Sequence, residues 1–420
     1  MSHQEDTILV FADWETFSTP VLMGKLSATR IRGKEIFGFE YDTDWLAHHH
    51  IQLDPDLLLF SGRQFLQEEK ANFGLFTDSS PDRWGRLLMR RREAALARME
   101  GRPEKKLLES DYLLGVFDAY RMGGLRFKNT MDGPFLNHNP SMAAPPFTSL
   151  RELEQASLHL EKDDSNLEPD YWKWLNLLMA PGSSLGGARP KASVVDPAGN
   201  LWIAKFPSRY DDQNMGAWEM VLHKLAIMAG IEMSNAFVEK FGSRHHTFIT
   251  QRFDRKVDCR IHFASAMTLL GYTDGIDFHD GASYLELAEF IMRKGAEPDK
   301  DLEQLWRRIV FHICTSNTDD HLRNHGFLLN SKGWRLSPAY DLNPNPNGTG
   351  LKLNISETDN ALDLDLALSV SAYFRLTRKK ALEIIETVTK ATNQWQMMAS
   401  QFKITKGEQE EMSKAFQSGF

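Results

Sequence analysis

Two short segments in the C-terminal half combine residue types that could catalyse phosphoryl transfer. The first reads N-T-D-D-H-L-R-N over residues 317–324, and the second reads S-P-A-Y-D over residues 337–341. In phosphoryl transfer from ATP, one Asp orients the attacking hydroxyl, while an Asn and a second Asp hold Mg²⁺ on the phosphates. Asp319 precedes Asn324 by the five residues that protein kinases use. We therefore predict Asp319 as the catalytic base, and Asn324 and Asp341 as ligands of Mg²⁺.

The neighbours of Asp319 leave other assignments open. Asp320 could serve as the base, but it lacks the five-residue step to Asn324. The whole segment could also be an Asx-rich turn that only caps backbone groups. His321 is expected to orient a nearby group by a hydrogen bond rather than to act as a base or metal ligand. Arg323 either neutralises a transferred phosphate or covers the surface.

A lysine in a predicted strand adds a candidate for binding ATP. In the strand 201–206, Lys205 shares one face with Leu201 and Ile203. A lysine on an apolar face is costly unless it is paired, and ATP phosphates would pair it. The alternative is a strand-end lysine that reaches water. Glu219, on the following predicted helix, either orients Lys205 or is solvated.

A loop of small residues precedes this strand. It matches neither the P-loop pattern nor G-x-G-x-x-G, but its two glycines would let backbone amides approach a phosphate. The lysine at its end would add positive charge, and the alternative is a flexible surface loop. The candidate nucleotide-binding residues of this loop are Ser184, Leu185, Gly186, Gly187, Ala188, Arg189 and Lys191.

Composition restricts the class of protein. A chain of 420 residues is expected to form two or three subdomains. The net charge of -8 does not favour a nucleic-acid partner for the chain alone. Cys259 and Cys314 lack C-x-x-C spacing, which argues against zinc ribbons and fits a reducing cytosol. No segment is apolar enough to span a bilayer, and the N-terminus lacks the basic flank of a signal peptide, so we expect a cytoplasmic protein.

The local patterns predict a β-rich beginning and a helical end. Ser80 is predicted to cap a helix with Pro81 at its first position, and residues 129–146 read as a linker. Strands are expected at 8–12, 36–41 and 248–253, helices near 148–161, 169–180, 215–229 and 302–313, and hairpins that turn at 196–200 and 330–333.

The helix after Pro81 is rich in arginine. Two interpretations of this pattern are open. The helix face is either solvated or contacts phosphates near DNA. The residues concerned are Arg83, Arg86, Arg90, Arg91 and Arg92.

Taken together, these residues resemble the HipA-like serine/threonine kinase family, the toxins of HipA/HipB toxin–antitoxin pairs. The pair N-x-D-x-H-x-x-N and P-A-Y-D-L is the most specific part of the resemblance. Supporting segments lie over most of the chain, at 39–46, 122–127, 184–191, 204–207 and 251–255. Two positions depart from the family: Arg189-Pro190 stands where relatives carry Gln-Glu, and Gln251 stands where Glu is common.

The resemblance implies an α+β fold, bilobal and protein-kinase-like, with a β-rich N-terminal subdomain and an all-helical C-lobe. Its implied domains are an N-terminal β-rich subdomain at 1–140, the remainder of the N-lobe at 141–255, and the helical lobe at 256–420.

The resemblance also implies roles for particular residues. It supports Asp319 as the base, Asn324 and Asp341 as Mg²⁺ ligands, and Lys205 as the lysine that binds ATP phosphates. It adds a hinge, Gln251 and Phe253, whose backbone reads adenine. Ser184 aligns with the serine that the family autophosphorylates, and phosphate there would eject the loop and switch the kinase off.

We therefore expect an ATP- and Mg²⁺-dependent serine/threonine protein kinase that acts as a toxin. The implied substrate is a translation component of the aminoacyl-tRNA synthetase type. The implied partner is a small HipB-like antitoxin through which DNA is mainly contacted. Two alternatives stay open: a non-catalytic scaffold that binds the antitoxin and strengthens operator binding, and a small-molecule kinase.

Overall fold

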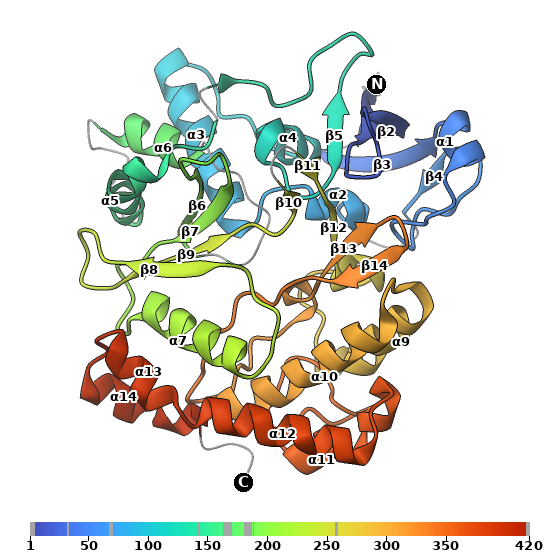
Figure 1. The fold of residues 1–420 in the computed structure, drawn as a ribbon. Helices are drawn as coiled ribbons and strands as arrows, with labels where there is room; N and C mark the ends of the chain where they lie inside the picture. Colours follow the sequence, from blue (N-terminus) through green and yellow to red (C-terminus); the bar gives the residue numbers. More distant parts are fainter. Residues whose placement is uncertain are drawn as a thin grey trace. The chain divides into compact units, whose positions relative to one another are not determined.

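The computed structural model describes residues 5–31, 33–66, 70–140, 143–162, 170–179, 187, 189–256 and 259–416. By their contacts, the residues form two compact units, whose elements are labelled in Figure 1. The N-terminal unit comprises Met1–Arg209, Asp254–Ala264 and Gly271–Thr273, and the C-terminal unit comprises Tyr210–Phe253, Ser265–Leu270 and Asp274–Phe420.

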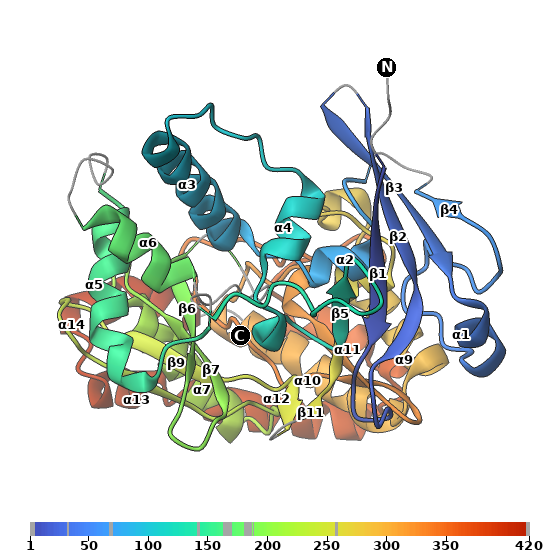
Figure 2. The same ribbon diagram turned by 90° about the horizontal axis from the view of Figure 1, so that it is seen from above.

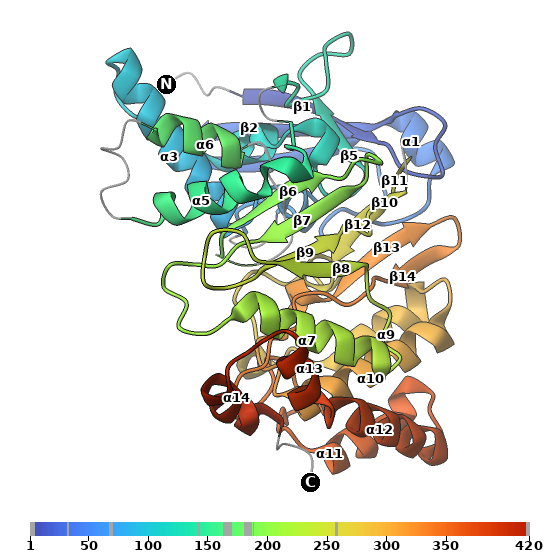
Figure 3. The same cartoon turned by 60° about the vertical axis from the view of Figure 1, so that its left-hand side comes forward.

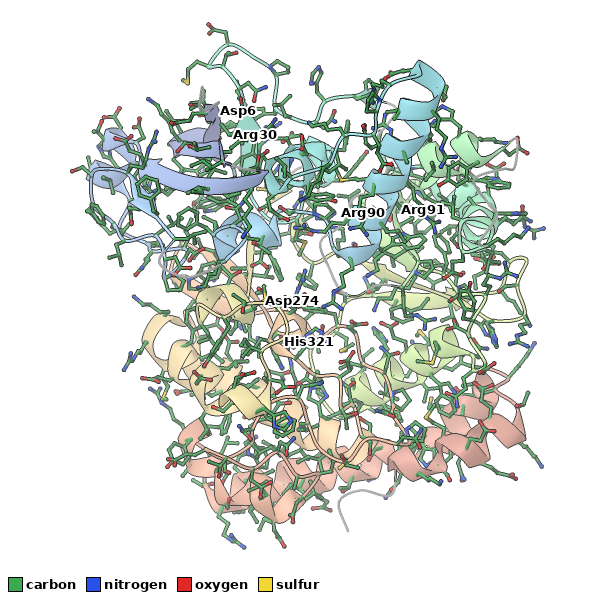
Figure 4. All side chains as sticks on the ribbon, turned by 180° about the vertical axis from the view of Figure 1, so that it is seen from behind. Asp6, Arg30, Arg90, Arg91, Asp274 and His321 are labelled. Carbon is green, nitrogen blue, oxygen red and sulfur yellow. The ribbon has the colours of Figure 1, made fainter. Side chains whose placement is uncertain are left out.

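The N-terminal unit is built on a five-stranded antiparallel sheet with the order β4-β3-β2-β1-β5. Its long strands β1, β2 and β3 run side by side in Figure 2. The buried positions of β1 and β3 include aromatic and β-branched side chains, which suit a half-buried pleated surface, whereas those of β2 are mainly small or unbranched at Cβ. Asp6 and Arg30 pair across two strands at 3.4 Å (Figure 4). The strands are β1 Glu5–Ala12, β2 Val21–Ile31, β3 Lys34–Tyr41, β4 Gln64–Phe65 and β5 Leu125–Lys128.

Helices and a hairpin complete this unit. Helices α5 and α6 pack on each other, and α6 also packs on α3. The predicted turn at 196–200 is confirmed, since it joins β6 and β7. The helices are α1 Thr43–His48, α2 Gly74–Asp78, α3 Arg83–Glu100, α4 Glu109–Gly115, α5 Leu150–Leu160 and α6 Tyr171–Met179, and the remaining strands are β6 Lys191–Val195, β7 Leu201–Lys205, β10 Arg255–Lys256 and β11 Cys259–Arg260, with β12 His262–Ser265 at the boundary of the unit.

The predicted cap of the arginine-rich helix is wrong. Helix α3 starts at Arg83, and the Asp82 carboxylate caps it by accepting a hydrogen bond from the Gly85 N–H at 2.8 Å. Ser80 Oγ instead donates to the Phe76 carbonyl of the preceding helix. A hydroxyl can satisfy a carbonyl of the helix that ends as well as an N–H of the helix that begins, and local sequence does not decide between them.

A buried arginine ties the loops of the N-terminal unit together. Arg121 is fully buried, and its guanidinium donates to four main-chain carbonyls at 2.7–3.1 Å. It also lies 4.6 Å from the centroid of the Phe127 ring. Burial lowers the pKa of Arg121 to about 9, with the charge of Asp118 opposing that shift. The guanidinium remains the donor that these carbonyls need.

The C-terminal unit is mainly helical, and its helices are seen together in Figure 3. Helix α10 is buried along most of its length, as its apolar spacing predicts, and Pro298 stands at its first position. Trp218 on α7 and Trp306 on α10 are fully buried. The helices are α7 Met215–Met228, α8 Ala266–Leu269, α9 Tyr284–Lys294, α10 Pro298–Thr315, α11 Leu364–Ser369, α12 Arg378–Thr392, α13 Trp395–Gln401 and α14 Lys406–Met412.

Two hairpins belong to the same unit: β8 Ala236–Glu239 with β9 Thr247–Gln251, and β13 Gly326–Asn330 with β14 Gly333–Leu336. The second confirms the hairpin predicted from the sequence. The C-terminal unit is therefore not all-helical, because it also contains strands. The two-unit division does not test the predicted boundaries after residues 140 and 255, which stay predictions. Over the ranges that the structure describes, no helix is both long and apolar enough to cross a membrane.

Candidate active site

The end of helix α10 starts the loop that carries the first motif. Ser316 adopts the left-handed conformation with φ 45°, and this ends the helix. The Asn317 N–H then donates to the His312 carbonyl at 3.0 Å, and its side-chain Nδ2 lies 2.9 Å from His312 Nδ1. Two contacts from one residue fix the direction in which the chain leaves the helix.

The motif folds on itself around one carbonyl. The main-chain oxygen of Asp319 accepts from the His321 N–H at 3.0 Å and from Asn324 Nδ2 at 3.0 Å. Residues Leu322–Asn324 form a single 3₁₀ turn. The five-residue step therefore brings Asn324 back against Asp319, as the motif predicts.

The two adjacent carboxylates face different environments. Asp319 is exposed, and its carboxylate makes no hydrogen bond or ion pair among the residues that the structure describes. Asp320 is buried with 2% of its surface exposed. Its Oδ2 accepts from the Tyr284 hydroxyl at 2.6 Å and from His325 Nε2 at 2.8 Å. Of the two, only Asp319 is available to a substrate.

Electrostatics keep Asp320 ionised. Burial by itself raises the pKa of this carboxyl, but the charges of His312 and His325 and the hydrogen bonds from His325 and Tyr284 outweigh burial, so the pKa lies well below its usual range. Burial lowers the pKa of His312 to about 4. Burial and the charge of Asp320 raise the pKa of Tyr284 well above its usual value, so its hydroxyl keeps the proton that it donates.

The second motif lies along the first. The Tyr340 hydroxyl donates to the Arg323 carbonyl at 2.7 Å, which joins the residue before Asp341 to the residue before Asn324. Further along, Asn345 Nδ2 donates to Thr318 Oγ1 at 2.8 Å. The structure thus brings together the two segments that the sequence predicts to act together.

Asp341 has an unusual backbone. Its φ of 58° lies in the left-handed region, which non-glycine residues seldom occupy and which Asp tolerates better than most. Such conformations cluster at functional sites. Asn343 Nδ2 lies 3.5 Å from Asp341 Oδ1.

Asn324 has the chemistry of a ligand for a hard cation. Its Nδ2 is used by the Asp319 carbonyl, which leaves its buried Oδ1 without a hydrogen-bond partner in the described part of the chain. Buried acceptors are normally satisfied, so this oxygen has the capacity to coordinate a cation. Within the described residues, no three or more His, Cys, Asp or Glu side chains are grouped to hold a metal. An amide and a carboxylate oxygen fit Mg²⁺, which takes its other ligands from phosphates and water.

His321 and Arg323, two further polar residues of the first motif, are half-exposed. Arg323 Nη1 lies 3.8 Å from Asp274 Oδ2; Asp274 and His321 are labelled in Figure 4. The Nδ1 of His321 is buried without a hydrogen-bond partner among the described residues. The orienting hydrogen bond predicted for His321 therefore stays a prediction.

Of the predicted hinge residues, Gln251 ends strand β9 and Phe253 lies two residues beyond it. The Gln251 N–H donates to the Asn235 carbonyl at 2.8 Å, and its side-chain oxygen accepts from Asn235 Nδ2. The ring of Phe253 lies 5.5 Å from that of Tyr340, next to Asp341 in the chain. Glu219, for which orientation of Lys205 and a solvated position were both left open, is buried on α7.

The structure places some of the nucleotide-binding residues that were predicted in the N-terminal unit, and their role stays a prediction. Lys205 is half-buried at the end of β7, opposite Lys191 in the strand pair. Lys191 is buried and forms an ion pair with Asp82 at 2.7 Å, and its Nζ also lies 3.3 Å from the Gly187 carbonyl. Arg189 is half-exposed. The remaining predicted residues, Ser184, Leu185, Gly186 and Ala188, lie outside the described residues.

Sequence reasoning missed the link between two of the family segments. The Gly123 N–H donates to the buried Asp254 carboxylate at 2.9 Å, and Arg255 donates to that carboxylate at 2.7 Å. Gly123 has φ 72°, and a side chain there would meet the Phe263 backbone. The adjacent glycines at 123–124 were the available signal, since a tight approach needs them.

Comparison with known proteins agrees with this fold. The two motif segments lie together in the mainly helical C-terminal unit. The family model described as the HipA-like C-terminal domain matches residues 183–395, just over half of the chain. The chain therefore belongs to the HipA-like family, and the family predicted from the sequence is confirmed.

Two solved structures are similar to this one. One is HipA of Shewanella oneidensis MR-1, determined with HipB and operator DNA. The match has a TM-score of 0.63 and 17% sequence identity, and it covers 94% of this chain and 93% of the HipA chain. This likeness confirms the mixed α and β, kinase-like fold. The other is the Helicobacter pylori proinflammatory kinase CtkA. That match has a TM-score of 0.41 and 15% sequence identity, and it covers 54% of this chain and 88% of the CtkA chain.

One relative is similar in sequence. A Haemophilus influenzae protein named "Putative kinase" is 26% identical over an alignment of 182 residues that covers 38% of this chain. The chain spans about half the length of that relative, 52%.

Proposed function

We propose that this protein is an ATP- and Mg²⁺-dependent serine/threonine protein kinase. The observation that carries the proposal is the contrast between adjacent carboxylates. Asp320 is buried and fully engaged, while Asp319 is exposed beside Asn324, whose Oδ1 is unpaired among the described residues. A base that reaches a substrate and a hard oxygen ligand at its side are what phosphoryl transfer requires.

The site residues have distinct proposed roles. Asp319 accepts the proton of the attacking hydroxyl as its oxygen bonds to the γ-phosphorus and ADP leaves. Asn324 and Asp341 would hold Mg²⁺, which would supply positive charge to the phosphates when bound. Arg323 is placed to add positive charge, and His321 to orient a neighbouring group.

The remaining nucleotide contacts are proposed from the family. Lys205 binds the ATP phosphates, and the backbone of Gln251 and Phe253 reads adenine. Ser184 is the proposed site of autophosphorylation. Lys191 is not a good phosphate ligand, because its ammonium is already neutralised by Asp82.

The biological role is proposed by analogy with the HipA-like family. We propose a toxin whose partner is a HipB-like DNA-binding antitoxin, and whose substrate is a translation component of the aminoacyl-tRNA synthetase type. Membership of the HipA-like family and the HipA–HipB–operator complex of the Shewanella relative support the partner. The net charge of -8 supports contact with DNA mainly through the antitoxin.

The test uses purified full-length protein and γ-labelled ATP with Mg²⁺. Wild type should incorporate label at Ser184, located by phosphopeptide mass spectrometry, and Asp319→Ala should not. The matched control is Asp365→Ala, which removes another exposed carboxylate of the same unit and should label normally. Equal labelling of Asp319→Ala and wild type would contradict the role of Asp319.

The scaffold alternative predicts a different result. A scaffold need not bind nucleotide, so ATP with Mg²⁺ should leave its melting temperature unchanged. The kinase should be stabilised by ATP in a Mg²⁺-dependent manner. Labelling of a small metabolite but of no protein would favour the small-molecule kinase.

A further inference from the structure

One face of helix α10 carries a buried row of polar side chains. Asp301, Arg308 and His312 are spaced by seven and four residues, which places them on the same face of the helix. All three have at most 2% of their surface exposed. Buried polar groups in a core helix are costly, so what they contact indicates why they are there.

The side chains of this row contact the starts of both motif segments of the candidate site. Asp301 accepts from the Leu336 N–H at 3.0 Å, at the end of β14. Arg308 donates through Nη2 to the Ser337 carbonyl, at the start of the segment that ends in Asp341. His312 contacts Asn317, at the start of the other segment. Helix α10 therefore serves as a common support for both motif segments.

Asp320 extends this support to the catalytic loop itself. His312 Nε2 lies 3.2 Å from Asp320 Oδ2, a contact without the geometry of a hydrogen bond. The same oxygen accepts from Tyr284 on α9 and from His325, which follows Asn324. One carboxylate oxygen thus joins α9, α10 and the far end of the loop.

Because Asp320 is adjacent to Asp319 in the chain, its position also determines the position of Asp319. Asp319 is exposed and Asp320 is buried, so the inward side chain holds the peptide that carries the outward one. The Asp319 carbonyl is the acceptor that orients Asn324. A shift of the Asp320 anchor would therefore move the base and the proposed metal ligand together.

We propose that Asp320 is a positioning residue for the phosphoryl-transfer site. Its ionised carboxylate, held by Tyr284 and His325, sets the place of Asp319 and the orientation of Asn324 without touching the substrate. The inference deepens the proposed function and rests on it. A misplacement of about 1 Å can reduce a rate by roughly 10²-fold, so such an anchor has a measurable effect.

The test compares Asp320→Asn and Tyr284→Phe with wild type. An amide keeps the shape of Asp320 but not its charge, and phenylalanine removes one hydrogen bond to it. With γ-labelled ATP and Mg²⁺, kcat should fall by roughly 10–100-fold in Asp320→Asn, and less in Tyr284→Phe. The KM for ATP should stay within about twofold, and the Mg²⁺ concentration for half-maximal rate should rise.

The control is Glu408→Gln in the same unit. The Glu408 carboxylate also accepts two hydrogen bonds, from the Asn214 N–H and from Trp218 Nε1, but none from the motif loop. This variant should lose stability while its kcat stays unchanged. If Asp320→Asn behaves like this control, with lower stability and wild-type kcat, the residue is only structural and the proposal is wrong.

A second readout does not depend on activity. Hydrogen exchange of the backbone amides at 319–324 should become about tenfold faster in Asp320→Asn than in Glu408→Gln. Equal exchange in the two variants would overturn the positioning role even if the protein is a kinase. Faster exchange in a protein without phosphotransfer would support the anchor and refute the proposed function. If Asp320→Asn does not fold, Tyr284→Phe decides by the same two measurements.

Discussion

The ion pair between Lys191 and Asp82 makes a prediction that separates a structural lysine from a phosphate-binding one. Lys191 opens strand β6, and Asp82 caps helix α3. Their side chains are 2.7 Å apart and only 4% and 2% exposed. Trp84 Nε1 also donates to the Lys191 carbonyl at 3.1 Å. The pair therefore attaches the start of α3 to the β6–β7 hairpin.

The expected loss in the free energy of unfolding follows from the burial of this ion pair. Lys191→Met removes the cation but leaves the Asp82 carboxylate buried, and breaking a buried pair in this way costs about 3–5 kcal/mol. For a unit of about 200 residues this corresponds to a fall in melting temperature of roughly 6–20 °C. Asp82→Asn should be similarly destabilising, although Asn caps a helix about as well as Asp.

The assay is thermal unfolding followed by circular dichroism, together with the KM for ATP. Because the two side chains interact directly, the double variant Asp82→Asn/Lys191→Met should recover roughly 1–3 kcal/mol relative to the sum of the single variants. The KM for ATP of the folded protein should be similar in both single variants.

The reasoning would be refuted by a different pattern. Suppose that Lys191→Met melts within about 1 °C of wild type and weakens ATP binding, whereas Asp82→Asn does not weaken it. Lys191 would then be a phosphate ligand, and the ion pair would contribute little to stability.

Three further predictions concern other parts of the molecule. Arg121→Ala leaves four main-chain carbonyls, three of them buried, without their donor and should destabilise the N-terminal unit by about 3–5 kcal/mol in urea unfolding. Burial lowers the pKa of His262 to about 3. Because the unfolded chain then binds more protons below about pH 6.5, stability should fall with acidification, by about 2 kcal/mol between pH 7 and 5. His262→Phe, which keeps the stacking on Trp14, should lose this part of the pH dependence. Asn324→Ala should lower ATP turnover by roughly 10²-fold, and a titration of the metal should show a higher Mg²⁺ concentration for half-maximal rate.

The local elements and the motif were predictable because both depend on short stretches of chain. Apolar periodicity predicts α10, and the glycine and asparagine turn predicts the β13–β14 hairpin. The cap of α3 was not predictable, because Ser80 and Asp82 are both good caps, and the ion pair with a lysine 109 residues away favours Asp82.

The sequence by itself determined the family, the kinase-like fold class and the pair of motifs that carry the proposed chemistry, because spacing within one loop or one helix is a local property. Only the tertiary structure decided which of the two neighbouring aspartates is buried and which is exposed. Tyr284, His312 and His325 come from separate elements and enclose Asp320, which leaves Asp319 exposed. The physical reason is that burial and hydrogen-bond partners depend on which segments meet in space, and chain order does not specify this.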